Sequence, residues 1–133
     1  MTALFGNRAL ADAAAGKLKV FAQPQRLMIL SLLLEGERTV GEIDAATGVG
    51  QPALSQQLAA LRRTKLVLAR KEAKNVYYAL ADDGVALCVR TLEAIMCDAG
   101  DLAQRLSEIL SSDTRVPQAQ SAPAGSAVFA RIE

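Results

Sequence analysis

The middle of the chain contains two short helical patterns separated by a tight turn, and this arrangement restricts the fold more than any other feature. The first pattern begins at Thr39, a residue suited to an N-cap, and ends at Gly48, which favours a helix stop. In the second pattern, Leu54, Leu58 and Leu61 are spaced i, i+4 and i+7, so they share one helix face. Two short helices joined by a turn that contains glycine predict a helix-turn-helix.

Further elements are expected on both sides of this unit. Two helices precede it, at residues 7–20 and from Pro24 to about Glu35. A β-hairpin follows at residues 66–80, where β-branched, aromatic and leucine residues flank the polar centre KEAKN. A long helix is expected at residues 82–112. The predicted fold is therefore mainly α with a small β-hairpin, the arrangement of a winged helix-turn-helix.

An apolar stripe follows the predicted helix at residues 82–112, with Val85, Cys88 and Leu92 in its first half. A chain of 133 residues is about one domain in size and cannot cover so long a stripe by itself. We therefore expect a homodimer that buries the stripe together with the alanine-rich N-terminal helix. The domain is expected to span residues 1–112, and residues 113–133, which are low in bulky side chains, are expected to form a disordered tail.

Composition excludes several classes of protein. The chain has no histidine and only two cysteines, and it shows no glycine-rich phosphate loop or paired-carboxylate cleft. We therefore expect that the protein is not an enzyme and uses no cofactor. No apolar run approaches the roughly 20 residues of a membrane span, and the N-terminus lacks the pattern of a secretion signal. The protein is thus expected to be cytoplasmic, with no membrane partner.

Positive charge is concentrated in one part of a nearly neutral chain. The net charge is +1, but residues 50–75 contain six basic side chains against Glu72 alone, which gives a local charge of +5. The six are Arg62, Arg63, Lys65, Arg70, Lys71 and Lys74. A single lysine is usually just a solvated surface residue, but a basic patch beside a helix-turn-helix is the electrostatic footprint of a DNA-binding protein.

The second helix of the predicted helix-turn-helix has glutamine and serine side chains on its exposed face. In a major groove such side chains contact base edges, while nearby basic side chains contact phosphates. The base-contacting candidates are Gln51, Ser55 and Gln56. Pro52 would shape the helix start and contact a thymine methyl, whereas Gln57 borders the apolar face and has the alternative role of bracing the turn. The phosphate-contacting candidates are Arg62, Arg63, Lys71 and Lys74.

Two stretches of the sequence resemble the arsenic-repressor (ArsR/SmtB) family of winged helix-turn-helix repressors: FAQPQRLMILSLLLEGE and VGEIDAATGVGQPALSQQLAALRRTKLVLARKEAKNVYYALAD. The resemblance covers roughly residues 17–100. It implies a homodimer with its recognition helix at residues 51–63 and its wing at residues 66–80. Such a dimer leaves its double-stranded operator DNA when it senses an inducer. One departure is that a histidine frequent in the family's recognition helix is Gln57 here.

The metal sites of this family do not match the chain. The arsenic-type site requires cysteines in the helix that is written TVGEIDAA here, and this helix has none. The zinc-type site in the terminal helix requires histidines and carboxylates, and the chain has no histidine. Metal sensing is therefore not expected.

The sulfide- and persulfide-responsive branch of the family is more similar. Its members have EGE followed by a VGEL-like sequence, one cysteine in the helix before EGE and another near the end of the terminal helix. Cys97, in LEAIMCDAG, matches the second cysteine, and Ser31 occupies the position of the first. The resemblance implies a repressor that responds to reactive sulfur species, with Cys97 as a sensor thiol and Ser31 in place of its partner. Serine keeps the shape of cysteine and removes its thiol chemistry.

Alternatives stay open for these residues. The default role of Ser31 in a helix is a hydrogen bond back to the carbonyl of Leu27, and the default role of Cys97 is that of a small buried residue. Cys88, on the apolar stripe, is expected to be a core or dimer-interface thiol. Ser31 is either an engineered replacement of cysteine or a natural substitution. Two other functions remain: an ArsR-type regulator without thiol sensing, and a winged-helix module for protein contacts.

Overall fold

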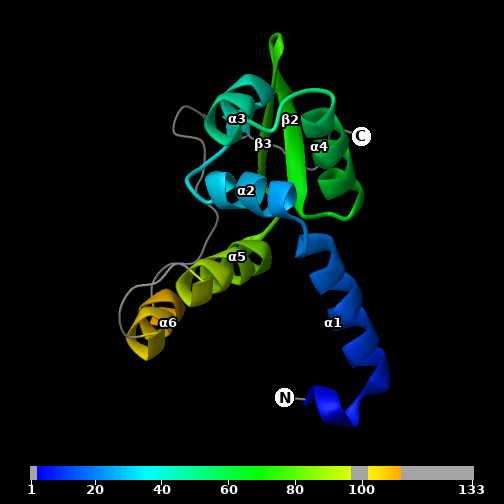
Figure 1. Cartoon of the computed structure of the whole chain (residues 1–133), viewed down its shortest axis with the longest axis vertical. Coiled ribbons are helices and arrows are strands. Elements are labelled where there is room, and N and C mark those ends of the chain that lie inside the picture. Colours follow the sequence, from blue (N-terminus) through cyan, green and yellow to red (C-terminus); the bar gives the residue numbers. More distant parts are fainter. Residues whose placement is uncertain (1–2, 97–101, 112–133) are drawn as a thin grey trace.

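A computed structural model describes residues 3–96 and 102–111 of the chain (Figure 1). Helices form most of it, with a small antiparallel sheet set among them. In chain order the elements are η1 (Leu4–Gly6), α1 (Arg8–Phe21), α2 (Pro24–Leu33), β1 (Arg38–Thr39), α3 (Val40–Thr47), α4 (Ala53–Arg63), β2 (Val67–Glu72), β3 (Asn75–Leu80), α5 (Asp83–Met96) and α6 (Leu102–Ser111). The predicted class, a winged helix-turn-helix, is confirmed.

The hydrophobic core lies where α2, α3, α4, the sheet and the start of α5 meet. Leu54, Leu58 and Leu61 are all buried in it, as their spacing on one helix face predicted. They pack with α2, which contributes Ile29 and Leu30 to the same cluster. Burial of such side chains is worth about 1.5–3 kcal/mol each, so this shared core fixes α4 against α2.

Local side-chain hydrogen bonds define the helix ends that the sequence predicts. The Asn7 side chain accepts from the backbone N–H of Leu10 at 2.9 Å and starts α1. Thr39 and Glu42 form a reciprocal capping box at the start of α3, which satisfies two backbone donors. Gly48 ends α3 with a φ of 69°, in the left-handed region that glycine enters without steric cost.

The sheet contains a strand that the sequence did not indicate. Its order is β1-β3-β2, and β2 and β3 form the predicted hairpin around Ala73 and Lys74. The additional strand β1 is only two residues long, and Arg38 and Thr39 pair with Tyr78 and Tyr77 of β3. Two residues are too few to show a strand pattern, so this pairing depends on the tertiary fold.

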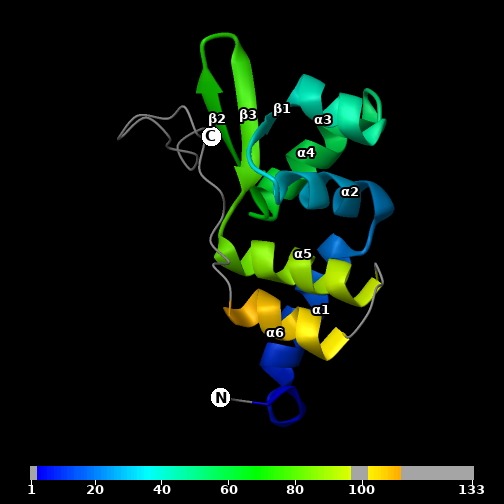
Figure 2. The ribbon, with the colours of Figure 1, turned by 90° about the vertical axis from the view of Figure 1, so that its left-hand side faces the viewer.

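The prediction of a single long helix at residues 82–112 is wrong. Its described residues form two helices, α5 and α6, which contact each other and lie side by side in Figure 2. The sequence between them includes Gly100, a residue that costs about 1 kcal/mol within a helix, and a folded-back α6 can bury apolar side chains against α5. Residues 113–133, expected to form a tail, lie outside the described residues.

Helix α1 extends away from the core (Figure 1). Its last residue, Phe21, is buried, whereas Leu10 and Leu18 are exposed. Exposed apolar side chains also occur near the other end of the chain, with Ile95 on α5 and Leu110 on α6. Within the described ranges, no helix combines the length and the apolar character needed to cross a membrane.

Candidate functional site

The exposed face of α4 lies opposite its buried leucines. Gln51, Pro52, Ser55 and Gln56 are all exposed, as expected for side chains that contact a ligand in solution. The helix begins at Ala53, so Gln51 and Pro52 precede it and the predicted start at residue 51 is two residues early. Gln51 instead holds the first turn, because its Oε1 accepts from the Ser55 hydroxyl at 2.7 Å and from the Ser55 backbone N–H at 3.2 Å.

Gln57 connects α4 to α2. Its Oε1 accepts from Nε of Arg26 at 2.8 Å, and its Nε2 donates to Oε1 of Gln25 at 3.2 Å. Arg26 also donates to the carbonyl oxygen of Val20 at 3.2 Å, at the end of α1. Both ends of the Gln57 amide are thus engaged with α2, and not with the turn between α3 and α4 that the sequence alternative named.

The hairpin carries basic residues in addition to those at the end of α4. The exposed basic residues in this region are Arg63, Lys65, Lys71 and Lys74, and Arg62 is half-buried. Helix α4 contacts β2, and the two-residue turn that includes Lys74 forms the end of the hairpin (Figure 1). The structure therefore places basic side chains at the C-terminal end of α4 and at the tip of the hairpin.

Arg70 does not belong to this exposed surface, although it is one of the six basic residues that give the region its charge. Its side chain is 6% exposed and binds Glu37 through two nitrogens, with Nε to Oε2 at 2.9 Å and Nη2 to Oε1 at 2.5 Å. Nη1 donates to Glu72 at 2.6 Å, and the guanidinium lies 4.5 Å from the ring centroid of Tyr77. The hydrogen bonds to Glu37 are the main reason that the pKa of Arg70 is raised above its usual value.

Arg70 and Glu72 offset each other's charge in this ion-pair cluster, so the net positive charge of the region comes from its other five basic residues. Glu37 was not a candidate, because it lies 33 residues from Arg70 and no local pattern links the two. Glu37 lies in the connection after α2 and directly precedes β1. The Glu37–Arg70 pair therefore connects the hairpin to the segment that leads into the helix-turn-helix.

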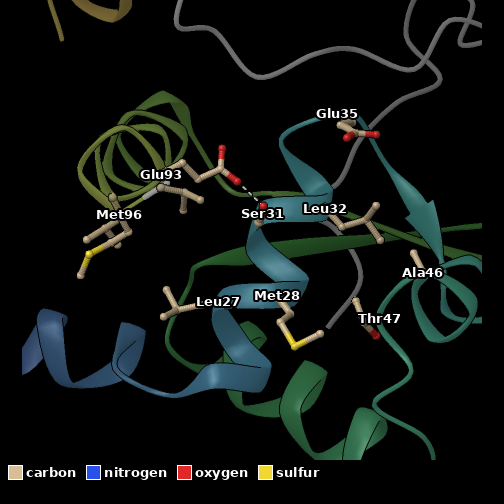
Figure 3. Close-up of a pocket in the computed structure, with 11 residues that line it drawn as sticks. Leu27, Met28, Ser31, Leu32, Glu35, Ala46, Thr47, Glu93 and Met96 are labelled. Atoms are coloured by element: carbon tan, nitrogen blue, oxygen red, sulfur yellow. Dashed lines mark hydrogen bonds between the residues drawn. The ribbon is translucent and has the colours of Figure 1, made fainter. Parts of the chain in front are cut away.

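Ser31 lies between α2 and α5. Its hydroxyl donates to Oε2 of Glu93 on α5 (Figure 3), and not to the carbonyl of Leu27 as the default role would require. A hydroxyl has one proton to donate, and a carboxylate is a stronger acceptor than a backbone carbonyl. Ser31 and Glu93 are both half-buried. The bond links α2 with α5.

Cys97 lies outside the described residues. Met96, the residue before it, ends α5 and lines the same groove as Ser31. Cys88 is a half-buried free thiol that packs against the core. In the described part of the chain, no group of three or more His, Cys, Asp or Glu residues is placed to hold a metal ion.

Comparison with known proteins connects this geometry to one family. The family described as "Bacterial regulatory protein, arsR family" matches residues 23–67, which include α2, α3 and α4. The chain is 46% identical over 80 residues to the biofilm growth-associated repressor of Agrobacterium fabrum. That alignment covers 60% of this chain and 68% of the relative.

Solved structures of transcriptional regulators also match this chain in both fold and sequence. The crystal structure of the transcriptional repressor BigR from Xylella fastidiosa matches with a TM-score of 0.63 and 40% identity, over 68% of this chain and 89% of BigR. The solution structure of the homodimeric winged helix-turn-helix DNA-binding domain of Mb0332 from Mycobacterium bovis matches with a TM-score of 0.60 and 36% identity. It covers 71% of this chain and 87% of that domain.

Proposed function

The chain belongs to the arsR family of bacterial regulatory proteins, and from this premise we propose that it is a dimeric repressor that binds operator DNA through α4 and the β2–β3 wing. It is a transcriptional regulator and not an enzyme. The observation that carries the proposal is the exposed polar face of α4, which lies opposite a buried leucine face and beside a basic hairpin.

The roles within this interface follow from exposure. Gln56 and Ser55 are exposed near the start of α4, where a recognition helix contacts base edges. Gln51 and Pro52 form the entry to that helix, and Arg62, Arg63, Lys71 and Lys74 would contact phosphates on either side. Gln57 is expected to hold α4 in place rather than contact a base, because its amide is bound to α2.

The test compares two variants by fluorescence anisotropy, with operator DNA and random duplex. Gln56→Ala is expected to lower the discrimination between the two DNAs by a factor corresponding to about 1–3 kcal/mol. Lys74→Ala is expected to weaken both complexes together and to reduce the salt dependence by about one phosphate contact. Lys17→Ala is the control for loss of charge, because Lys17 belongs to α1, which extends away from the wing (Figure 1).

The reverse pattern would mean that the roles of helix and wing are exchanged. Binding to random duplex that does not change with salt would instead favour a winged-helix module for protein contacts.

A homodimer is proposed because α1 leaves Leu10 and Leu18 exposed and α6 leaves Leu110 exposed. A second copy of the chain would cover these side chains through a symmetric contact. The Mb0332 domain is described as homodimeric, which supports the same arrangement here. Sedimentation at micromolar concentration should give the mass of a dimer, and a monomer would contradict the proposal.

The proposed trigger is modification of Cys97 by reactive sulfur species, completed by a partner thiol at position 31, where this chain has Ser31. Ser31 bonds α2 to α5, and Cys97 directly follows the last residue of α5. With cysteine at position 31, a persulfide donor would transfer one sulfur atom to Cys97, and the donor would leave as a thiol. The second thiol would then attack the inner sulfur of the Cys97 persulfide, forming a disulfide and releasing hydrogen sulfide. The Ser31 chain cannot take this last step, so it should remain on its operator.

The test is anisotropy with operator DNA before and after a persulfide donor, for this chain and for Ser31→Cys, with mass spectrometry of the 31–97 link. Only Ser31→Cys should release DNA, by a shift of about 1–3 kcal/mol in binding free energy. Adding Cys88→Ala to Ser31→Cys is the control and should leave the response intact, because Cys88 packs against the core. Equal release by the Ser31 chain would refute the two-thiol trigger.

A further inference from the structure

A groove follows the outer face of α2, with α5 on one side and α3 on the other (Figure 3). Its volume is about 490 Å³, which falls within the range of about 300–1,000 Å³ typical of small-molecule sites. The apolar lining includes Leu27, Met28, Leu32, Leu92 and Met96. Most of the surface of the groove is thus apolar, as in sites that enclose the body of an organic ligand.

Two methionines make this lining adaptable. Met28 is 46% exposed and Met96 is 76% exposed, so neither is held by the core. Methionine side chains are flexible, and their sulfur atoms make favourable contacts with aromatic rings. A ligand with an aromatic body would therefore cover both side chains.

The charge of the groove has one sign. Among the described residues that line it, the ionisable ones are Glu35 and Glu93, and no lysine or arginine lines it. Glu35 is largely exposed and lies 3.5 Å from a nitrogen of Arg38, whereas Glu93 is half-buried beside the apolar lining. The Ser31 hydroxyl donates to Glu93 but leaves its negative charge in place.

We propose that this groove binds an organic cation, an ammonium group attached to an aromatic or aliphatic body. The ammonium donates to the carboxylate of Glu93, and the hydroxyl oxygen of Ser31 can accept a further hydrogen bond from it. The body lies over Met28 and Met96. This site goes beyond the regulator function and its thiol trigger, and its test needs neither DNA nor a persulfide.

The experiment uses three probes with the same body and different head groups: 4-phenylbutylammonium, 4-phenylbutanol and 5-phenylpentanoate. The full-length protein has ¹³C-labelled methionine methyl groups, and NMR titration follows Met28 and Met96. The cation should bind about tenfold more tightly than the alcohol, which is the factor expected for a charge-assisted hydrogen bond over a neutral one. The carboxylate should bind more weakly than the alcohol, because Glu93 repels it.

Two variants assign the preference to one carboxylate. Glu93→Gln should bring the affinities for cation and alcohol within about twofold of each other, since the neutral amide has no charge to pair. Glu108→Gln removes a carboxylate on α6 that accepts from Gln104 at 3.1 Å, and it should keep the tenfold preference. The unliganded spectra of both variants show whether each one is folded.

Several outcomes would overturn the proposal. Equal binding of the three probes, or no shift of either methionine, refutes an organic-cation site in the wild-type chain without reference to any variant. If Glu93→Gln still prefers the cation to the alcohol, the ammonium is recognised by a group other than Glu93, which contradicts the proposal. Methionine shifts that depend on protein concentration alone would mean that a second copy of the chain occupies the groove.

Discussion

Replacing Arg70 with methionine tests whether the buried ion pair stabilises the wing. The guanidinium makes two hydrogen bonds to Glu37, and the two side chains are only 6% and 10% exposed. Arg70→Met would leave the Glu37 carboxylate in a desolvated site with no cation. Removing one partner of a buried pair typically costs about 3–5 kcal/mol, and the lost contact with the Tyr77 ring adds about 0.5–1 kcal/mol.

The lower end of that range is expected here. Glu37 lies between α2 and β1, where its carboxylate can turn towards water, and Glu72 is already 57% exposed. We therefore expect Arg70→Met to lower the free energy of unfolding by about 3.5 kcal/mol, a large part of the 5–15 kcal/mol typical of a domain. Urea unfolding followed by circular dichroism gives this value, at a fixed protein concentration because the proposed dimer makes stability depend on it.

A double variant separates the net contribution of the Arg70–Glu37 pair to stability from the cost of leaving the Glu37 carboxylate unpaired. Arg70→Met combined with Glu37→Met removes both charges and should recover most of the loss, because apolar side chains of similar volume often replace a buried pair without penalty. Arg8→Met is the matched control, since the Arg8–Asp12 pair is exposed and should be worth about 0.3–0.5 kcal/mol. The reasoning fails if Arg70→Met costs no more than Arg8→Met, or if the double variant is as unstable as the single one.

Three smaller changes test local features. Gln57→Ala should lower the free energy of unfolding by about 1–2 kcal/mol, because it removes both hydrogen bonds between α4 and α2, and urea unfolding measures this. Thr39→Ala should cost about 1 kcal/mol in the same assay through loss of the capping box, whereas Thr39→Ser should be nearly neutral. Ala73→Gly should raise the melting temperature through a gain of about 1 kcal/mol, because Ala73 has a φ of 55°, and its operator affinity should not change since Lys74 is retained.

Elements set by short-range patterns could be predicted from the sequence. Thr39 and Gly48 mark the ends of α3 through contacts within a few residues, and the leucine spacing of α4 reports its buried face directly. The hairpin followed from strand-forming residues on both sides of a polar turn. Each of these features is determined by residues that are close together in the sequence and follow the periodicity of a single helix or strand.

The features that were missed depend on contacts between distant parts of the chain. Glu37 and Arg70 are 33 residues apart, and Ser31 and Glu93 are 62 residues apart, so neither pair has a sequence period. Both α5 and α6 keep the helical spacing of the apolar stripe, and the stripe alone could not show that α6 packs beside α5. Exposure agrees with the pattern for the candidate DNA contacts Gln56 and Lys74. Arg70, which was counted only in the local charge, is buried by contacts that the sequence pattern does not show.

The pairing of β1 with β3 makes the wing and the helix-turn-helix a single mechanical unit. The ladder at Arg38 and Thr39 attaches the residues directly before α3 to the hairpin. In the proposed dimer, two such units would contact half-sites about 34–36 Å apart, a separation set by one turn of DNA. The spacing of the half-sites in the operator would then fix the separation of the two units. A small tilt of either unit would move its wing and its α4 together out of register with the DNA. An inducer would need to change only the distance between the two units, without unfolding any part of either.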